Sequence, residues 1–156
     1  MKFYHVSKRK LTEGTILTVG VYGERISRHN YIENEYKTYI KEEIFEAIRA
    51  RHYPDLPSRL NCVFLYEKLT EARESHAKKT AYKGYVYEVA ILEGQPLIAE
   101  MDLLNCDGLS YQKITACAHK YWSKTKHLES TTLEVLLNGK VLVKKMVLGP
   151  SILVEL

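Results

Sequence analysis

The distribution of apolar residues along the chain predicts a protein whose strands lie mostly in its second half. Runs rich in Val, Ile, Leu and Tyr are typical of β-strands. Only one such run precedes residue 60. The runs occupy residues 3–6, 61–66, 85–92, 97–103, 131–137, 141–147 and 152–155.

Three other segments have the pattern of amphipathic helices. A repeat of apolar residues every four positions predicts a helix from about 32 to 51, with one apolar stripe. Thr70 is placed to cap a shorter helix at 71–79, because its hydroxyl can accept a hydrogen bond from a free first-turn amide. A third helix is predicted after Ser110. The stripe of the first helix consists of Ile32, Tyr36, Ile40, Ile44 and Ile48, and the buried side of the third would carry Ile114, Cys117, Ala118 and Tyr121.

Two short polar segments separate strands and predict hairpins. Asn138-Gly139 lies between the runs at 131–137 and 141–147, and both of its residues tolerate the positive φ of a tight hairpin turn. Glu93-Gly94-Gln95-Pro96 predicts a looser hairpin, because of its proline. Early helices followed by antiparallel strands favour an α+β fold in a single domain spanning 1–156, without a parallel doubly wound sheet.

The composition agrees with this fold and narrows the setting of the protein. The 156 residues are 46% hydrophobic and 27% charged, which favours one folded globular domain over a disordered chain. The three cysteines cannot all pair and show no CxxC spacing, so a reducing, cytoplasmic setting is expected. No apolar run has the length of a signal peptide or of a membrane span, so no membrane partner is expected.

Charge and aromatic content indicate a polar ligand without identifying it. The net charge of +4 would help the chain approach an anion such as a dinucleotide or a nucleic acid. Twelve tyrosines accompany three phenylalanines and one tryptophan. Tyrosine combines a stacking face with a hydroxyl that can remain hydrated, which suits cleft walls and interfaces. Ordinary packing of half-buried strand tyrosines is the alternative.

Several common chemistries have no motif in this sequence. It contains no GxGxxG after a strand, no GxxxxGK[ST], no HExxH, no GxSxG and no EF-hand loop. Cys117 and His119 lie two positions apart on a predicted helix, so their side chains would point away from each other. We therefore expect no metal site.

Two segments of the first half combine polar residues with strand patterns. Residues 3–7 place His5 and Ser7 on one face of a short strand. Residues 58–67 lead from Arg59 into an apolar strand. The ordinary alternatives are a surface histidine and a solvated arginine.

A third segment places a carboxylate in an apolar strand. The alternation in residues 128–137 puts Glu134 on one face and Leu133, Val135 and Leu137 on the other. Burying a carboxylate without a partner costs free energy, so Glu134 is either open to water or functional.

Together, these three segments resemble the ADP-ribosyltransferase superfamily, in particular its small bacterial members. The elements that carry the resemblance are a Tyr-His-x-Ser strand, a Val-Phe-Leu-Tyr strand followed by an Ala-containing helix, and a Glu-Val-Leu-Leu strand before a tight turn. Their order and spacing agree over most of the chain. The resemblance implies a pair of mostly antiparallel sheets with a central cleft and flanking helices. It also implies NAD as a substrate, without a metal.

The resemblance implies a role for several positions of the first two segments. His5 would bind a ribose hydroxyl of NAD, and the backbone N–H and C=O of Val6 would hold the nicotinamide carboxamide. Ser7 completes this first motif. Phe64 and Tyr66, on one face of the second strand, would contact the nicotinamide ring or its ribose.

The resemblance also points to Glu134 as the catalytic glutamate. Cleavage of the bond between nicotinamide and ribose builds positive charge on the anomeric carbon, as in glycoside hydrolysis. A carboxylate at the ribose 2′-hydroxyl stabilises this charge most strongly in the transition state, which raises the rate. Arg59 could contact the pyrophosphate through its planar guanidinium, or could be an exposed arginine at the start of a strand.

These observations predict an NAD-dependent mono-ADP-ribosyltransferase that modifies a protein or nucleic-acid acceptor. A role as a toxin or phage-defence factor, with an antitoxin partner, is a further hypothesis. The alternatives are a non-catalytic nucleotide- or nucleic-acid-binding module, with tyrosines stacking on bases, and a protein-interaction domain. Lys8, Arg9 and Lys10 could steer NAD or a nucleic acid, or form an ordinary solvated loop.

Overall fold

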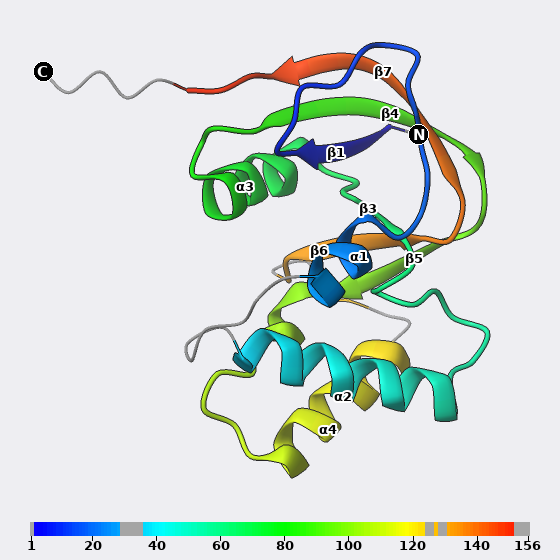
Figure 1. Ribbon diagram of the computed structural model, residues 1–156, viewed down its shortest axis with the longest axis vertical. Helices are drawn as coiled ribbons and strands as arrows, with labels where there is room; N and C mark the ends of the chain where they lie inside the picture. Colours follow the sequence, from blue (N-terminus) through cyan, green and yellow to red (C-terminus); the bar gives the residue numbers. More distant parts are fainter. Residues whose placement is uncertain (1, 29–35, 124–126, 128–130, 152–156) are drawn as a thin grey trace, which may run out of the picture.

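Strands and helices alternate irregularly along the chain (Figure 1). The computed structural model describes residues 2–28, 36–123, 127 and 131–151. The elements of these residues are β1 (Phe3–Ser7), β2 (Ile16–Leu17), α1 (Val21–Arg28), α2 (Tyr36–His52), β3 (Val63–Leu65), α3 (Leu69–Thr80), β4 (Tyr85–Glu93), β5 (Pro96–Glu100), the 3-10 helix η2 (Met101–Leu104), α4 (Tyr111–Ser123), β6 (Leu133–Leu137) and β7 (Lys140–Leu148).

The strands form two antiparallel sheets in a single α+β domain. The first sheet has the strand order β1-β4-β7-β2, and the second has the order β3-β6-β5. All their pairings are antiparallel. The α+β prediction is therefore confirmed. None of the helices in the described part of the chain is long and apolar enough to span a membrane.

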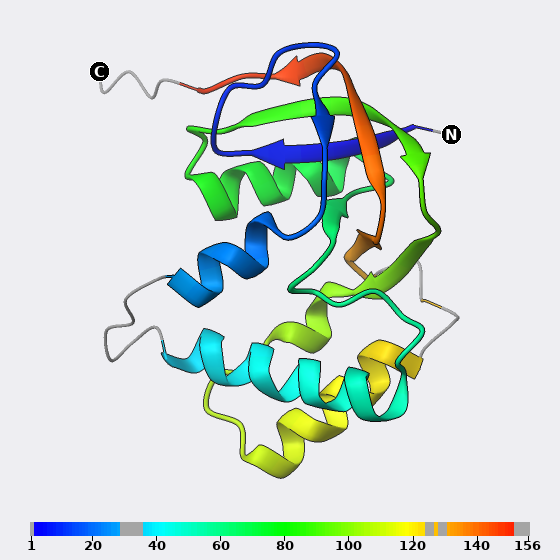
Figure 2. The ribbon, with the colours of Figure 1, turned by 45° about the vertical axis from the view of Figure 1, so that its right-hand side comes forward.

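Both predicted hairpins are wrong, because β4 and β5 belong to different sheets, as do β6 and β7. Instead, the β4–β5 segment pairs with the β6–β7 segment, and together they form one long antiparallel ribbon that bends from the first sheet into the second (Figure 2). The pairing continues through the bend from Glu93↔Lys140 to Pro96↔Leu137. Glycines allow the two backbones to approach there, since a Cβ on Gly139 would lie 1.9 Å from the carbonyl oxygen of Glu93.

The second sheet is the middle layer of the molecule. Figures 1 and 2 show it between the first sheet and the layer of α2 and α4. One of its faces contributes Val63, Leu65, Val135 and Leu137 to the core shared with the first sheet. The opposite face packs against the helices, with Leu136 among Phe45, Ala118 and Trp122. Among the described residues, apolar side chains of both sheets pack against each other in this core, and the predicted central cleft stays a prediction.

The predicted helices are present, but the first of them does not bury the apolar stripe that the sequence suggests. In α2 the stripe is only partly buried: Ile44 lies in the core, whereas Tyr36 and Ile40 are 51% and 48% exposed. The helix buries Phe45 and Glu42 instead, since it packs against α4 and the second sheet. Residues 32–35 lie outside the described part of the chain.

The remaining boundaries differ at the ends of elements. Thr70 does not cap α3, which begins at Leu69 after Lys68. The strand predicted at 97–103 ends at Glu100 and continues as η2. The predicted helix after Ser110 is confirmed as α4, with Ile114, Ala118 and Tyr121 buried and Cys117 at its edge. The strand predicted at 152–155 lies outside the described residues.

Candidate functional site

A buried ion-pair network lies between the second sheet and the helical layer. Arg59 is at its centre, in the segment that joins α2 to β3. Its Nε atom donates to both carboxylate oxygens of Glu42, at 3.2 and 3.1 Å, and its Nη1 donates to Tyr121 Oη at 2.8 Å and to Glu134 Oε1. Glu42, Arg59 and Glu134 are 1%, 6% and 0% exposed. These values exclude the alternatives of a solvated Arg59 and a solvated Glu134.

Four separate segments bring these side chains together. Glu42 comes from α2, Tyr121 from α4 and Glu134 from β6, whereas Arg59 precedes β3. The alternation of β6 placed Glu134 on the face of Leu136, as predicted. This face is covered by the helices, which explains why the carboxylate is buried.

Aromatic rings enclose the guanidinium. Its central carbon lies 5.0 Å from the ring centroid of Phe64, 5.5 Å from that of Tyr121 and 5.9 Å from that of Tyr22. Such contacts favour a cation once it is removed from water. Tyr22, from α1, also donates its hydroxyl to Glu42 at 2.9 Å and packs edge-on against Phe64. The side chain of Tyr22 thus covers the network.

Opposite charges favour the ionised forms of Glu42 and Arg59 despite their burial. Burial raises the pKa of the Glu42 carboxyl, but the charges of Arg59 and Lys41 outweigh this effect and hold the pKa below its usual value. Burial disfavours the Arg59 cation, but Glu134, Tyr121 and Glu42 raise its pKa well above the usual range. Desolvation lowers the pKa of Lys41, which lies 3.7 Å from Glu42. For the Glu42–Arg59 pair, the contact between opposite charges therefore outweighs the cost of desolvation.

One carboxylate oxygen of Glu134 accepts no hydrogen bond from the described residues. Oε1 accepts hydrogen bonds from Arg59 and from Tyr121, the latter at 2.7 Å. Oε2 is buried and has no hydrogen-bond partner among the described residues. A buried carboxylate oxygen without a donor is costly, and such an atom calls for an explanation such as a ligand or a catalytic role.

His5, in β1 of the first sheet, contacts β3 of the second sheet. Its Nδ1 atom lies 2.9 Å from the backbone oxygen of Phe64. Because a carbonyl oxygen can only accept, Nδ1 carries the hydrogen, and Nε2 holds a lone pair when the ring is neutral. Burial lowers the pKa of His5, although the bond to Phe64 opposes this effect. The neutral ring can therefore accept a hydroxyl hydrogen through Nε2.

Next to His5, the edge of β1 that faces the second sheet has backbone groups without a neighbouring strand among the described residues. Tyr4 and Tyr66 exchange two backbone hydrogen bonds of 2.8 Å, an isolated bridge between β1 and the residue that follows β3. Val6 presents its N–H and C=O to the same side as Tyr4, because these groups alternate along a strand. Among the described residues, no backbone hydrogen bond continues the bridge at Val6. Ser7 instead forms a turn, with its hydroxyl bonded to the backbone of Arg9.

The structure thus brings together four of the seven predicted site residues, around Phe64. The Phe64 carbonyl holds His5 and its ring contacts Arg59, which in turn holds Glu134. Tyr66 is directed elsewhere: it is 2% exposed, and its hydroxyl is hydrogen-bonded to Ser75 and Lys79 of α3. The other two predicted residues are Val6 and Ser7, on the strand edge beyond His5.

Sequence reasoning missed Glu42 and Tyr22. Tyr121 was predicted to be buried, and a buried tyrosine hydroxyl needs a hydrogen-bond partner; this was a signal for a polar group inside the helical layer. Glu42 carried no such signal. It lies two positions from both Ile40 and Ile44 of the apolar stripe, so the helical pattern predicted that Glu42 lies on the opposite, solvent-exposed side.

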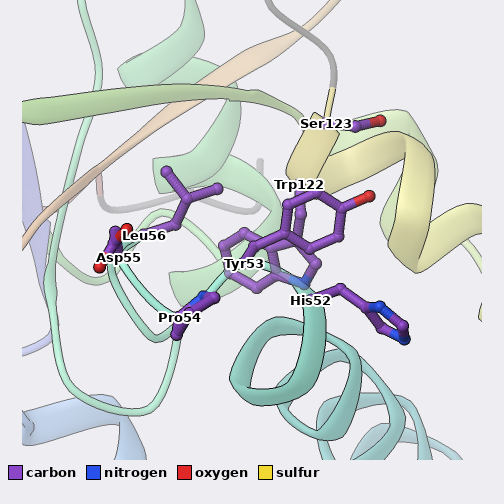
Figure 3. Close-up of a pocket in the computed structure, with 7 residues that line it drawn as sticks. All are labelled: His52, Tyr53, Pro54, Asp55, Leu56, Trp122 and Ser123. Carbon is purple, nitrogen blue, oxygen red and sulfur yellow. The ribbon is translucent and has the colours of Figure 1, made fainter.

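A hollow of about 420 Å³ lies away from this network, at the ends of α2 and α4 (Figure 3). None of the predicted site residues lines it. Its neighbours Tyr53 and His119 share a 3.2 Å hydrogen bond. Its lining residues are His52, Tyr53, Pro54, Asp55, Leu56, Trp122 and Ser123. In the part of the chain that is described, no group of three or more His, Cys, Asp or Glu residues could hold a metal ion.

Fold and site together define an α+β protein whose middle sheet carries a buried Arg-carboxylate network. Residues 6–148 match a family model described as "Protein of unknown function (DUF2441)". This match covers most of the chain, so the protein belongs to that family. A search of curated proteins gives no match.

Proposed function

We propose that the protein is an NAD-dependent mono-ADP-ribosyltransferase with Glu134 as its catalytic residue. The observation that carries the proposal is the unpartnered Oε2 of Glu134, on a carboxylate whose other oxygen is fixed by Arg59 and Tyr121. A carboxylate held in this way is preorganised, because only one oxygen remains to bind a hydroxyl.

The neighbouring groups support NAD as the ligand. The Nε2 lone pair of His5 can accept a ribose hydroxyl, and the backbone groups of Val6 offer a donor and an acceptor for a carboxamide. Phe64 lies between His5 and Arg59, where its position suits a contact with the nicotinamide or its ribose. Ser7, at the end of β1, remains a candidate for a contact with NAD, whereas Tyr66 is buried against α3 and takes no part in this proposal.

Arg59 takes a further role in this proposal beside the one that its sequence context suggested. Its Nε and Nη1 atoms are occupied by Glu42, Tyr121 and Glu134, so we assign Arg59 as the residue that positions Glu134. Its Nη2 atom, which donates to none of the described residues, remains for a contact with the pyrophosphate. Tyr22 covers the network.

The reaction would break the glycosidic bond between nicotinamide and ribose and transfer ADP-ribose to an acceptor. Glu134 would stabilise the positive charge on the ribose through its 2′-hydroxyl, more strongly in the transition state than in bound NAD. A macromolecular acceptor, a toxin or phage-defence role and an antitoxin partner belong to the same proposal.

Nicotinamide release from NAD by the purified protein tests the proposal. Glu134→Gln keeps the size of the side chain and an oxygen for Arg59, and it should lower the rate by about 10²–10³-fold. Glu74→Gln is the matched control, since Glu74 belongs to an exposed ion pair with Lys78 on α3, away from the network. Release at an equal rate by Glu134→Gln and the parent, or no release and no NAD binding by the parent, would contradict the proposal.

A further inference from the structure

A second hollow, also of about 420 Å³, is ringed by lysines at the C-terminal end of α3. Lys8 follows β1, Lys78 and Lys79 lie in the last turns of α3, and Lys83 precedes β4. We call these four residues the lysine surface. The rest of the lining is uncharged and consists of Thr80, Ala81 and Gly84.

The charges of this surface are only partly neutralised. Lys78 forms an exposed ion pair with Glu74 at 2.6 Å. Lys79 donates to Tyr66 Oη at 3.1 Å, which leaves two of its three N–H groups available. The ammonium groups of Lys8 and Lys83 have no ion-pair partner among the residues that the structure describes. The helix dipole accounts for lysines at the end of α3, but not for Lys8 or Lys83.

Tyr82, an exposed aromatic residue, lies in the chain between two residues that line the hollow, Ala81 and Lys83. Ala81 and Tyr82 have φ values of 50° and 62°, a left-handed conformation that is uncommon for residues other than glycine. Tyr82 is 46% exposed. One side of the ring contacts His76, at 6.0 Å between the centroids. This backbone conformation therefore holds a tyrosine between Ala81 and Lys83 where its ring is accessible to solvent.

We propose that the lysine surface binds single-stranded nucleic acid, with phosphates on the lysines and a base stacked on Tyr82. Positive grooves with exposed aromatic rings are the usual means of binding single strands. The charge is spread over flexible side chains from three segments, which suits a series of phosphates better than one small anion. This surface does not depend on the chemistry of Glu134.

Fluorescence anisotropy with a labelled single-stranded RNA, measured over a range of salt concentrations, tests the proposal. Lys8→Ala/Lys83→Ala should weaken binding and reduce the slope of log K against log salt by about 1.4, that is, about 0.7 for each lost phosphate contact. Lys113→Ala/Lys120→Ala removes two exposed lysines of α4 and should leave both values unchanged.

A separate substitution tests the proposed stacking of a base on Tyr82. Tyr82→Ala should weaken RNA binding at least about fivefold, without changing the affinity for inorganic polyphosphate. Tyr111→Ala, at an exposed tyrosine of α4, is the control. The proposal is overturned if the parent does not bind RNA, if both lysine pairs have the same effect, or if polyphosphate, duplex RNA or anionic vesicles bind as well as the single strand. NAD cleavage by the same variants separates this result from the test of Glu134.

Discussion

Arg59 is the residue on which most of the buried charge depends. It neutralises Glu42 and Glu134, both of which are inaccessible to water. A buried ion pair contributes little net stability compared with apolar residues of the same size, but removal of one partner leaves uncompensated charge. The network therefore makes the fold sensitive to a single substitution.

We predict that Arg59→Met destabilises the protein by about 3–5 kcal/mol, because two carboxylates lose their shared partner. Urea unfolding followed by circular dichroism measures this change. Arg28→Met is the control, since its pair with Glu24 is exposed, and its effect should stay within about 0.5 kcal/mol. A loss below about 1 kcal/mol for Arg59→Met would show that the carboxylates find other partners.

His5 makes the stability of the fold depend on pH. Its folded-state pKa lies below the ordinary value, so the unfolded chain binds a proton more readily. The free energy of unfolding should therefore fall as the pH drops from about 7 to about 5. His5→Asn can still donate to the Phe64 carbonyl and cannot titrate, so it should flatten this dependence. His52→Asn, at an exposed histidine, should not. Identical pH profiles for parent and His5→Asn would refute the assignment.

At the scale of elements, the bent ribbon decides the architecture. The two polar segments have the composition of hairpin turns, yet the strands on either side of each belong to different sheets. Gly94 adopts a φ of 100°, and the missing side chain of Gly139 lets the Glu93 carbonyl come close. The turn residues thus lie where the paired strands bend sharply without losing their pairing, as bulges and glycines do in strongly curved sheets.

Gly139→Ala should destabilise the protein by about 1–3 kcal/mol, because its Cβ would overlap backbone atoms of Glu93. Gly149→Ala is a matched control: its Cβ would meet only Met146 Sδ, at 3.6 Å, and the change should stay within about 0.5 kcal/mol. Thermal and urea unfolding of both variants provides the comparison. Equal stability of the two would mean that the bend relaxes freely.

At the scale of the whole molecule, the middle sheet joins two cores. Val135 and Leu137 contribute to one core, and Leu136 to the other. Neither the helical layer nor the first sheet can separate without exposing β6. Trp122 lies in the helical core, and it is the only tryptophan of the chain.

We therefore predict a single cooperative unfolding transition. The fluorescence of Trp122 reports the helical layer, whereas far-ultraviolet circular dichroism also reports the sheets. Both signals should give the same urea midpoint, as expected for a two-state domain of this size. Two separate midpoints would show that the helical layer unfolds independently.

The sequence by itself determined the fold class and most element types, because these depend on local periodicity and on turn residues. It placed His5, Phe64 and Glu134 on the right strands and Arg59 before the strand of Phe64, and it placed Glu134 on the face of β6 opposite Val135. It also determined the buried face of α4. These features follow from positions that are close together in the chain.

Only the tertiary structure decided which faces are covered and which strands pair. Whether Glu134 is solvated or buried depends on α2 and α4, which pack on β6 from distant parts of the sequence. The same packing selected Glu42 as the partner of Arg59. The pairing of β4 with β7 could not be predicted, because the turn residues after β4 and before β7 favour pairing with the strand next in the chain, β5 and β6 respectively. Burial and pairing are properties of contacts between segments, and local patterns do not contain them.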